Sequence, residues 1–96
     1  MLTNPQKRFL RKNAHSLHPI FQVGKGGVTP NMVIQIAEAL EARELIKVSI
    51  LQNCEVPKEE VAETLSSRSG AELVQVIGRT IILYKESKNK KQIVLP

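Results

Sequence analysis

The organisation of this chain is set by one stretch, Ile20-Phe21-Gln22-Val23-Gly24-Lys25-Gly26-Gly27-Val28-Thr29-Pro30. The β-favouring residues Ile20 to Val23 lie between Pro19 and Gly24, which predicts a short strand. Thr29 is a favourable helix N-cap, and Pro30 suits the first helical position. A strand that passes through a glycine loop into a helix begins a crossover connection, so this stretch predicts a sheet covered by helices.

The loop between that strand and helix is a G-x-x-G motif, Gly24-Lys25-Gly26-Gly27. Glycines let the backbone approach a bulky ligand and adopt a positive φ, and a helix start offers unpaired N–H groups and a partial positive charge. We therefore expect a phosphate site that also includes Thr29 and Asn31, although a plain strand-to-helix turn is the alternative. A Walker loop is excluded because no hydroxyl follows Lys25, and a dinucleotide-binding loop is excluded because no G-x-G-x-x-G is present.

Working outward, the pattern predicts further elements on both sides of the loop. Thr3 and Gln6 have the spacing of a capping box for a first helix, which His18-Pro19 would end. Met32 to Leu40 supply the apolar stripe of the second helix. The expected elements are helix 3–17, strand 20–23, a helix from 30, strand 45–51, helix 58–69 capped by Gly70, and a hairpin of strands 73–77 and 80–85 around a type II′ turn at Gly78-Arg79.

This order, αβαβαββ, predicts an α/β fold: a single small domain, residues 1–96, with a four-stranded mixed sheet packed with helices. Its core would cover about residues 2–85, followed by a basic tail over 86–96. Within that tail, residues 86–92 are expected to be mobile, and residues 93–95 are a candidate for a brief edge strand. Ile81 to Leu83 are apolar on both faces, so the last strand should be central or covered on both sides. Lys47 and Ser49 share a strand face that should be only partly covered.

Other side chains carry expectations about burial. Phe9 and Phe21 are expected in the core, whereas Tyr84 could be buried or exposed. Glu38, Glu41 and Glu44 are expected to be solvated on a helix surface, where they would not serve in catalysis.

Charge is unevenly distributed along the chain, whose formal net charge is +5. Residues 1–25 contain five basic residues and no acidic residue, residues 26–84 are net acidic, and residues 85–96 are again basic. The first helix carries Lys7, Arg8, Arg11, Lys12 and His15 on one side, with no acid to form i,i+4 pairs. This asymmetry predicts contact with a polyanion, the alternative being a solvated helix face.

Several function classes have little support. Cys54 is the single cysteine, which excludes an intrachain disulfide and fits a cytoplasmic location, and no stretch has the pattern of a secretory signal or membrane span. His15, His18 and Cys54 lack the ligand number and spacing of a zinc site. No catalytic cluster stands out, so we expect no enzyme, no cofactor and no small-molecule substrate. Because only three aromatic residues are present, we expect contacts to RNA backbone and shape with little base stacking.

Four segments together resemble the CRM domain family (chloroplast RNA splicing and ribosome maturation). They are Leu10-Arg11 in the basic first helix, Gln22 to Gly27, Ala42-Arg43-Glu44-Leu45-Ile46-Lys47-Val48, and Gly78 to Leu83-Tyr84, and the resemblance spans roughly residues 2–85. Arg43 stands where the family usually has histidine. The chain looks like the bacterial stand-alone members of the YhbY type. The resemblance implies a fold similar to the C-terminal domain of translation initiation factor three, RNA binding, and a role in assembly of the large ribosomal subunit.

We therefore expect a monomeric RNA-binding protein that associates with ribosomal RNA or pre-ribosomal particles. The glycine loop and Lys25 would hold one phosphate, and the basic first helix would track neighbouring ones. Two alternatives stay open at this point: a protein-interaction module that places its basic face on an acidic partner, and a general binder of DNA.

Overall fold

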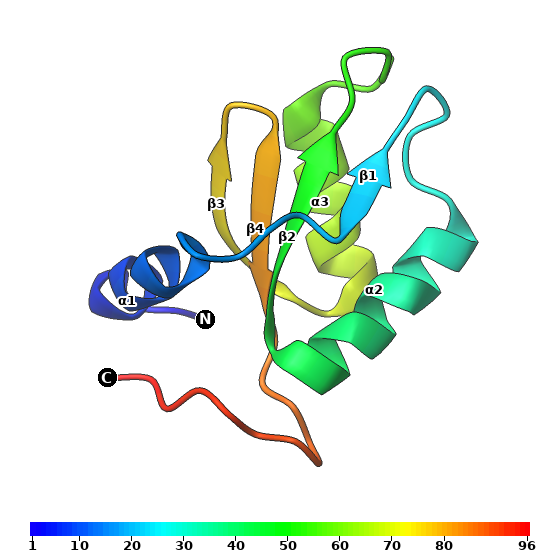
Figure 1. Ribbon diagram of the computed structural model, residues 1–96. Helices are drawn as coiled ribbons and strands as arrows, with labels where there is room; N and C mark the ends of the chain where they lie inside the picture. Colours follow the sequence, from blue (N-terminus) through cyan, green and yellow to red (C-terminus); the bar gives the residue numbers. More distant parts are fainter.

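A computed structural model describes residues 1–96 as three helices and four strands (Figure 1). In chain order these are α1 (Asn4–Ala14), β1 (Phe21–Val23), α2 (Pro30–Arg43), β2 (Leu45–Ile50), α3 (Lys58–Ser69), β3 (Glu72–Ile77) and β4 (Thr80–Tyr84). The expected order αβαβαββ is confirmed. None of the helices is long and apolar enough to span a lipid bilayer.

The strands form one mixed sheet in the order β1-β2-β4-β3. β1 pairs with β2 in parallel, as a crossover through α2 requires, and β4 is antiparallel to both β2 and β3. β4 is thus a central strand, as its run of apolar residues predicted. Gly78 has φ 57°, as the first position of a type II′ turn requires, and Ile77 pairs with Thr80 across that turn.

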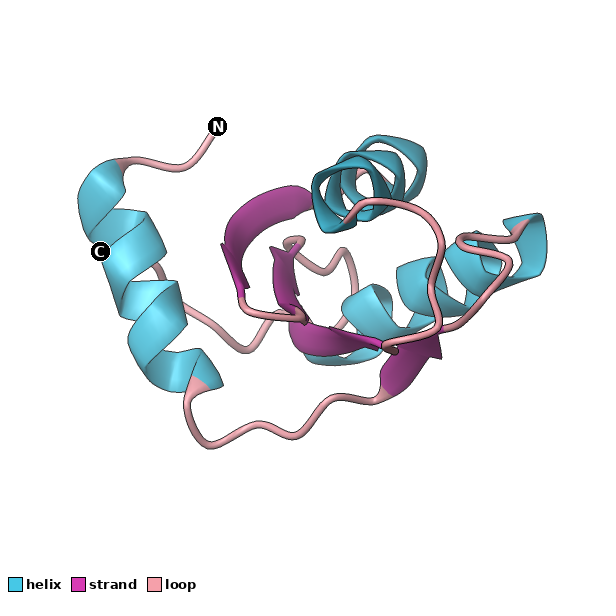
Figure 2. Ribbon diagram, turned by 90° about the horizontal axis from the view of Figure 1, so that it is seen from above, coloured by secondary structure: helices cyan, strands magenta, loops and turns pink.

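Helices lie over both faces of the sheet (Figures 1 and 2), and an apolar cluster lies on each face. On one face, α2 and α3 pack on the sheet around a cluster that includes Ile36, Leu40, Leu65, Ile81 and Leu83. On the other face, α1 packs around a smaller cluster made of Leu10, Ala14, Leu45, Val74, Ile82 and Tyr84. The ambiguous Tyr84 is therefore a core residue, whereas Phe9 and Phe21, expected in the core, are only partly buried at its edges.

Capping interactions explain where two of the helices begin or end. The side chain of Thr3 accepts a hydrogen bond from Gln6 N, and Gln6 Oε1 accepts one from Thr3 N, which completes the expected capping box. The prediction that α1 continues to residue 17 is wrong, because the helix ends at Ala14 and His15 is its C-cap. Gly70, with φ 74°, ends α3 in the left-handed conformation expected of a C-terminal glycine.

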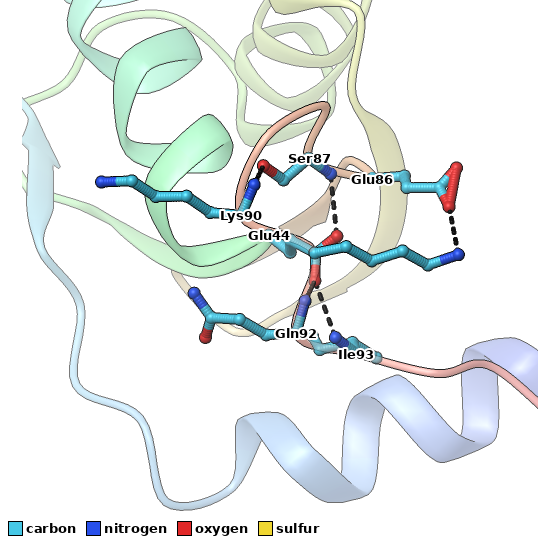
Figure 3. A network of polar contacts seen from close by, with 7 residues as sticks. Glu44, Glu86, Ser87, Lys90, Gln92 and Ile93 are labelled. Carbon is cyan, nitrogen blue, oxygen red and sulfur yellow. Dashed lines mark hydrogen bonds and ion pairs between the residues drawn. The ribbon is translucent and has the colours of Figure 1, made fainter.

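The C-terminal segment, residues 86–96, differs from the expected mobile tail and contains no strand. It folds back over the end of α2, where Glu44 is fully buried (Figure 3). The carboxylate of Glu44 accepts hydrogen bonds from three backbone N–H groups of this segment, those of Ser87 (2.8 Å), Gln92 (2.6 Å) and Ile93 (2.7 Å). We call this arrangement the Glu44 clasp.

A second carboxylate, in the last turn of α2, adds to the attachment. Glu41 accepts hydrogen bonds from Ser87 Oγ (2.9 Å), Lys88 N (3.0 Å) and Asn89 N (3.0 Å). The expectation that Glu41 and Glu44 are simply solvated is therefore wrong, although Glu38 is exposed as expected. The segment continues until Pro96 O accepts a hydrogen bond from Gln6 Nε2 (3.2 Å), so both ends of the chain meet beside α1 (Figure 1).

These contacts shift the acidity of both carboxyl groups. Burial raises the pKa of Glu44, but hydrogen bonds from the backbone of Ser87, Gln92 and Ile93 outweigh it and leave the pKa below its ordinary value. Hydrogen bonds from Lys88, Ser87 and Asn89 lower the pKa of Glu41 in the same way. Both groups are thus held in the charged form that the C-terminal segment needs.

Candidate nucleic-acid interface

The glycine loop lies at the carboxyl end of β1 and is built as a tight turn. Gly27 N donates a hydrogen bond to Gly24 O (3.0 Å), which closes the turn over Lys25 and Gly26. Gly27 has φ 73°, and a Cβ there would lie 2.9 Å from Val56 Cγ2 in the loop after β2. The fold therefore requires glycine at position 27, for both backbone conformation and packing.

Folding does not account for glycine at position 26 in the same way. A Cβ added to Gly26 would meet no atom within 4 Å, and its φ is not positive. The expected use of positive φ in this loop is therefore met by Gly27 alone. Gly26 and Lys25 are both exposed, so a side chain at position 26 would fill open space in front of the turn. That space is where a ligand backbone could approach the loop.

The loop leaves several backbone donors unused. The N–H groups of Lys25, Gly26 and Val28 donate no hydrogen bond within the protein. Backbone amides of successive residues in a turn can form a concave site for an anion. Together with the Lys25 ammonium group, these donors have the chemistry needed to bind a phosphate oxygen.

The start of α2 offers less than the sequence suggested. Pro30 has no N–H, and the side chain of Thr29 accepts the hydrogen bond from Met32 N (3.1 Å). Thr29 is therefore a confirmed helix cap whose oxygen is already engaged. Asn31, exposed at the second helical position, still has a backbone N–H without a partner in the protein. The helix contributes one free amide to the site in place of several.

The basic side of α1 is present as expected. Arg8, Lys12 and His15 are exposed, and Lys7 and Arg11 are half-buried, while Leu10 and Ala14 face the sheet. The structure contains two ion pairs, one between the N-terminus and Glu72 and one between Lys91 and Glu86. None of the cationic side chains of α1 is neutralised by a carboxylate. Arg11 and Lys12 also lie in the last turn, where positive charge favours the helix dipole.

The glycine loop and α1 do not lie next to each other. In Figures 1 and 2, α1 lies at one end of the molecule, and β1 with the loop after it lies toward the other. Between them is the part of the sheet face that α1 leaves uncovered. The strand register places Gln22, Ser49 and Thr80 side by side on this face, and Lys47 follows on the same side of β2. Lys47 and Ser49 are half-buried, which confirms the expected partial cover.

Sequence reasoning missed two cationic side chains at the same edge of the sheet as the glycine loop. Arg79, at the tip of the β3–β4 hairpin, donates from Nη1 to Leu51 O (3.4 Å), and Lys58, at the start of α3, donates from Nζ to Gly78 O (3.3 Å). The signal that could have found them is topological. A parallel β1–β2 pair puts the loops that follow both strands at the same edge of the sheet, and the hairpin tip between β3 and the antiparallel β4 reaches that edge too.

The sequence matches the CRS1 / YhbY (CRM) domain family over residues 2–85. It is 71% identical, over the full length of both chains, to a Bacillus subtilis protein named Probable RNA-binding protein YqeI. It is 35% identical over 90 residues to a Haemophilus influenzae protein named RNA-binding protein, with 94% of this chain and 91% of that one covered.

A solved structure has the same fold. The solution structure of the hypothetical protein SAV1595 from Staphylococcus aureus superimposes with a TM-score of 0.83 at 58% sequence identity, and the match covers all of both chains. The arrangement of three helices and a four-stranded sheet described above is therefore shared with an experimentally determined relative.

Proposed function

Because the chain belongs to the CRS1 / YhbY (CRM) domain family, we propose that it binds RNA and assists maturation of the large ribosomal subunit. Relatives named as RNA-binding proteins support the choice of RNA as the polyanion. The partner would be ribosomal RNA of the large-subunit precursor, and the protein would act by stoichiometric binding as a monomer. We infer no catalytic step, cofactor or metal in this role.

The observation that carries the proposal is the set of unused donors on the glycine loop. Lys25, Gly26 and Val28 present free backbone N–H groups around an exposed lysine. Exposed amides without partners are normally solvated by water, and an oxyanion can replace that water with stronger, charge-assisted bonds. The open space at Gly26 lets a sugar–phosphate backbone reach these donors.

The unneutralised cations of α1 supply a second set of contacts. Lys7, Arg8, Arg11 and Lys12, with His15, would contact phosphates of the same RNA, which must be long enough to pass from α1 to the loop. About three to five phosphate contacts would give a slope of log affinity against log salt of roughly −2 to −4.5. Such contacts set affinity and orientation and do not read sequence, so the choice of ribosomal RNA would come from RNA shape.

Binding is tested with two variants of the full chain, Lys25→Glu and the quadruple Lys7/Arg8/Arg11/Lys12 alanine variant. Affinity for a labelled large-subunit ribosomal RNA transcript is measured across a salt series, with circular dichroism as the check on folding. We expect both variants to bind more weakly, and the quadruple variant to have a shallower salt slope. Wild-type affinity in both folded variants would refute this surface.

A matched control separates charge at the proposed surface from charge in general. Arg68 is exposed in the last turn of α3, on the other side of the sheet from α1. Arg68→Gln should therefore bind RNA like the wild type. Duplex DNA as a competitor tests the DNA alternative, because equal affinity for DNA and ribosomal RNA at physiological salt would argue for a general nucleic-acid binder.

The role in ribosome maturation is tested in cells. We expect the tagged protein to sediment with precursors of the large subunit on sucrose gradients, and to leave those fractions after ribonuclease treatment. In-cell crosslinking would then map the RNA nucleotides beside Lys25 and α1. Partners that persist unchanged after RNA removal would favour a protein-interaction module instead.

A further inference from the structure

A groove lies at the same edge of the sheet as the glycine loop, and the loop that follows β2 separates the two. Its volume is about 500 Å³, and the residues that line it include Cys54, Glu55, Val56, Lys58, Gly78 and Arg79. Val56 is shared with the glycine loop, because its Cγ2 atom is the one that a Cβ on Gly27 would strike. Val56 therefore contacts the glycine loop and also lines the groove.

Arg79 and Lys58 are positioned in this groove by backbone carbonyl groups. Arg79 Nη1 donates to Leu51 O, and Lys58 Nζ donates to Gly78 O, at 3.4 and 3.3 Å. Leu51 also lies against Gly24, since a Cβ on Gly24 would be 3.9 Å from Leu51 Cδ1. The three loops at this edge of the sheet are thus linked to one another through direct contacts.

The two cations have unused binding capacity. A guanidinium group has five N–H donors and an ammonium group has three, and each of these side chains makes one hydrogen bond in the protein. Neither forms an ion pair, and both residues are exposed. Cations without counterions at the same edge of the sheet as free loop amides suit a chain of phosphates more than they suit a single small anion.

We propose that RNA backbone bound at the glycine loop continues past Val56 into this groove, where Arg79 and Lys58 each contact a phosphate. This proposal rests on the proposed RNA-binding function and adds a second segment to its path. The groove walls contain no aromatic side chain, so the contacts are to backbone and not to stacked bases. Glu55, the one carboxylate in the groove wall, repels the same phosphates.

The test measures binding of a short fluorescein-labelled RNA stem–loop to the full chain at several salt concentrations. Arg79→Gln and Lys58→Gln should each weaken binding about three- to tenfold and make the salt slope shallower by about 0.7–0.9, the value of one phosphate contact. Arg79→Lys should keep the wild-type slope because it keeps the charge. Glu55→Gln should bind about two- to threefold more tightly, because it removes a repulsive charge.

Two references make the outcome decisive. Arg68→Gln should match the wild type, and Lys25→Glu reports on the glycine loop itself. If Lys25→Glu weakens binding while Arg79→Gln, Lys58→Gln and Glu55→Gln all match the wild type, the groove proposal is overturned and the proposed function stands. If the wild type does not bind RNA, the proposed function fails and the groove proposal fails with it.

Discussion

Replacing Glu44 by glutamine tests the physical basis of the Glu44 clasp with a change of almost no volume. The wild-type carboxylate accepts three backbone N–H groups on two oxygens, Ser87 on Oε2 and both Gln92 and Ile93 on Oε1. A glutamine has one oxygen and one NH2 group. If its oxygen takes the place of Oε1, the N–H of Ser87 faces another donor in a buried site.

The magnitude follows from this geometry. A buried donor left without an acceptor costs about 1–3 kcal/mol, and the two remaining bonds lose the added strength of a charged acceptor. The variant no longer pays the cost of burying the charged carboxylate of Glu44, which offsets part of that loss. We expect Glu44→Gln to lower the free energy of unfolding by about 2–3 kcal/mol, which corresponds to about 10–20 °C in Tm for a chain of this size.

The lowered pKa of Glu44 adds a pH dependence with a definite sign. The unfolded chain takes up a proton near the ordinary value of 4.5, whereas the folded chain resists protonation to lower pH. The clasp therefore contributes its full stability above pH 4.5, and that contribution is lost as the pH falls from there toward the lowered native pKa. The difference in free energy of unfolding between the wild type and Glu44→Gln should be constant near neutral pH and should shrink as the solution is acidified.

Urea unfolding at a series of pH values measures both effects, and hydrogen exchange reports on the backbone N–H groups of Ser87, Gln92 and Ile93. These three should exchange faster in the variant. Glu38→Gln, on the exposed side of the same helix, is the control and should change stability by less than about 0.5 kcal/mol. A Glu44→Gln protein with wild-type stability at neutral pH and wild-type exchange in residues 87–93 would refute the reasoning.

The remaining predictions concern the glycine loop and the cap of α2. Gly27→Ala should lower stability by about 2–4 kcal/mol, because it combines a left-handed residue with a clash at Val56, and thermal unfolding checks this. Gly26→Ala should leave thermal stability within about 0.5 kcal/mol of wild type yet weaken RNA binding, as measured by fluorescence anisotropy. Thr29→Ala should cost about 1 kcal/mol in urea unfolding, since Met32 N loses its acceptor; no loss would contradict the capping role.

The sequence predicted the main elements well because their signals are local. Thr3 with Gln6, Thr29 with Pro30, and Gly70 each mark a helix end through chemistry within a few residues. The apolar run Ile81 to Leu83 indicated a strand covered on both faces, and β4 is central. The early end of α1 was missed because His15 to Leu17 have no feature that stops a helix before Pro19.

The C-terminal segment was mispredicted because it is held through its own backbone N–H groups, which leave no pattern in a sequence. A polar, lysine-rich segment has the composition of a mobile tail whether or not its backbone N–H groups are bound by an acceptor elsewhere in the fold. One signal was present: Ile36, Leu40 and Glu44 follow at intervals of four residues, so Glu44 extends the buried stripe of α2. A carboxylate on a buried stripe implies a set of donors, although not which segment supplies them.

The candidate site was predicted in part. The motif Gly24 to Gly27 identified the loop, and the run without acids identified the basic side of α1. The number of free amides at the start of α2 was overestimated, because Thr29 serves its own helix. Arg79 and Lys58 were missed because they lie far from Lys25 in the chain and reach the same edge of the sheet only through the order of the strands.

The position of β4 between β2 and β3 has a consequence for biosynthesis. The first fifty residues include β1 and β2, which pair along one edge of β2. The other edge of β2, which pairs with β4 in the native sheet, has no partner until residues 80–84 arrive. As the nascent chain leaves the ribosome, that edge stays open through synthesis of α3 and β3. The native sheet can therefore assemble only after residue 84 has emerged, and a chaperone that shields β2 during this interval would protect the protein from intermolecular strand pairing.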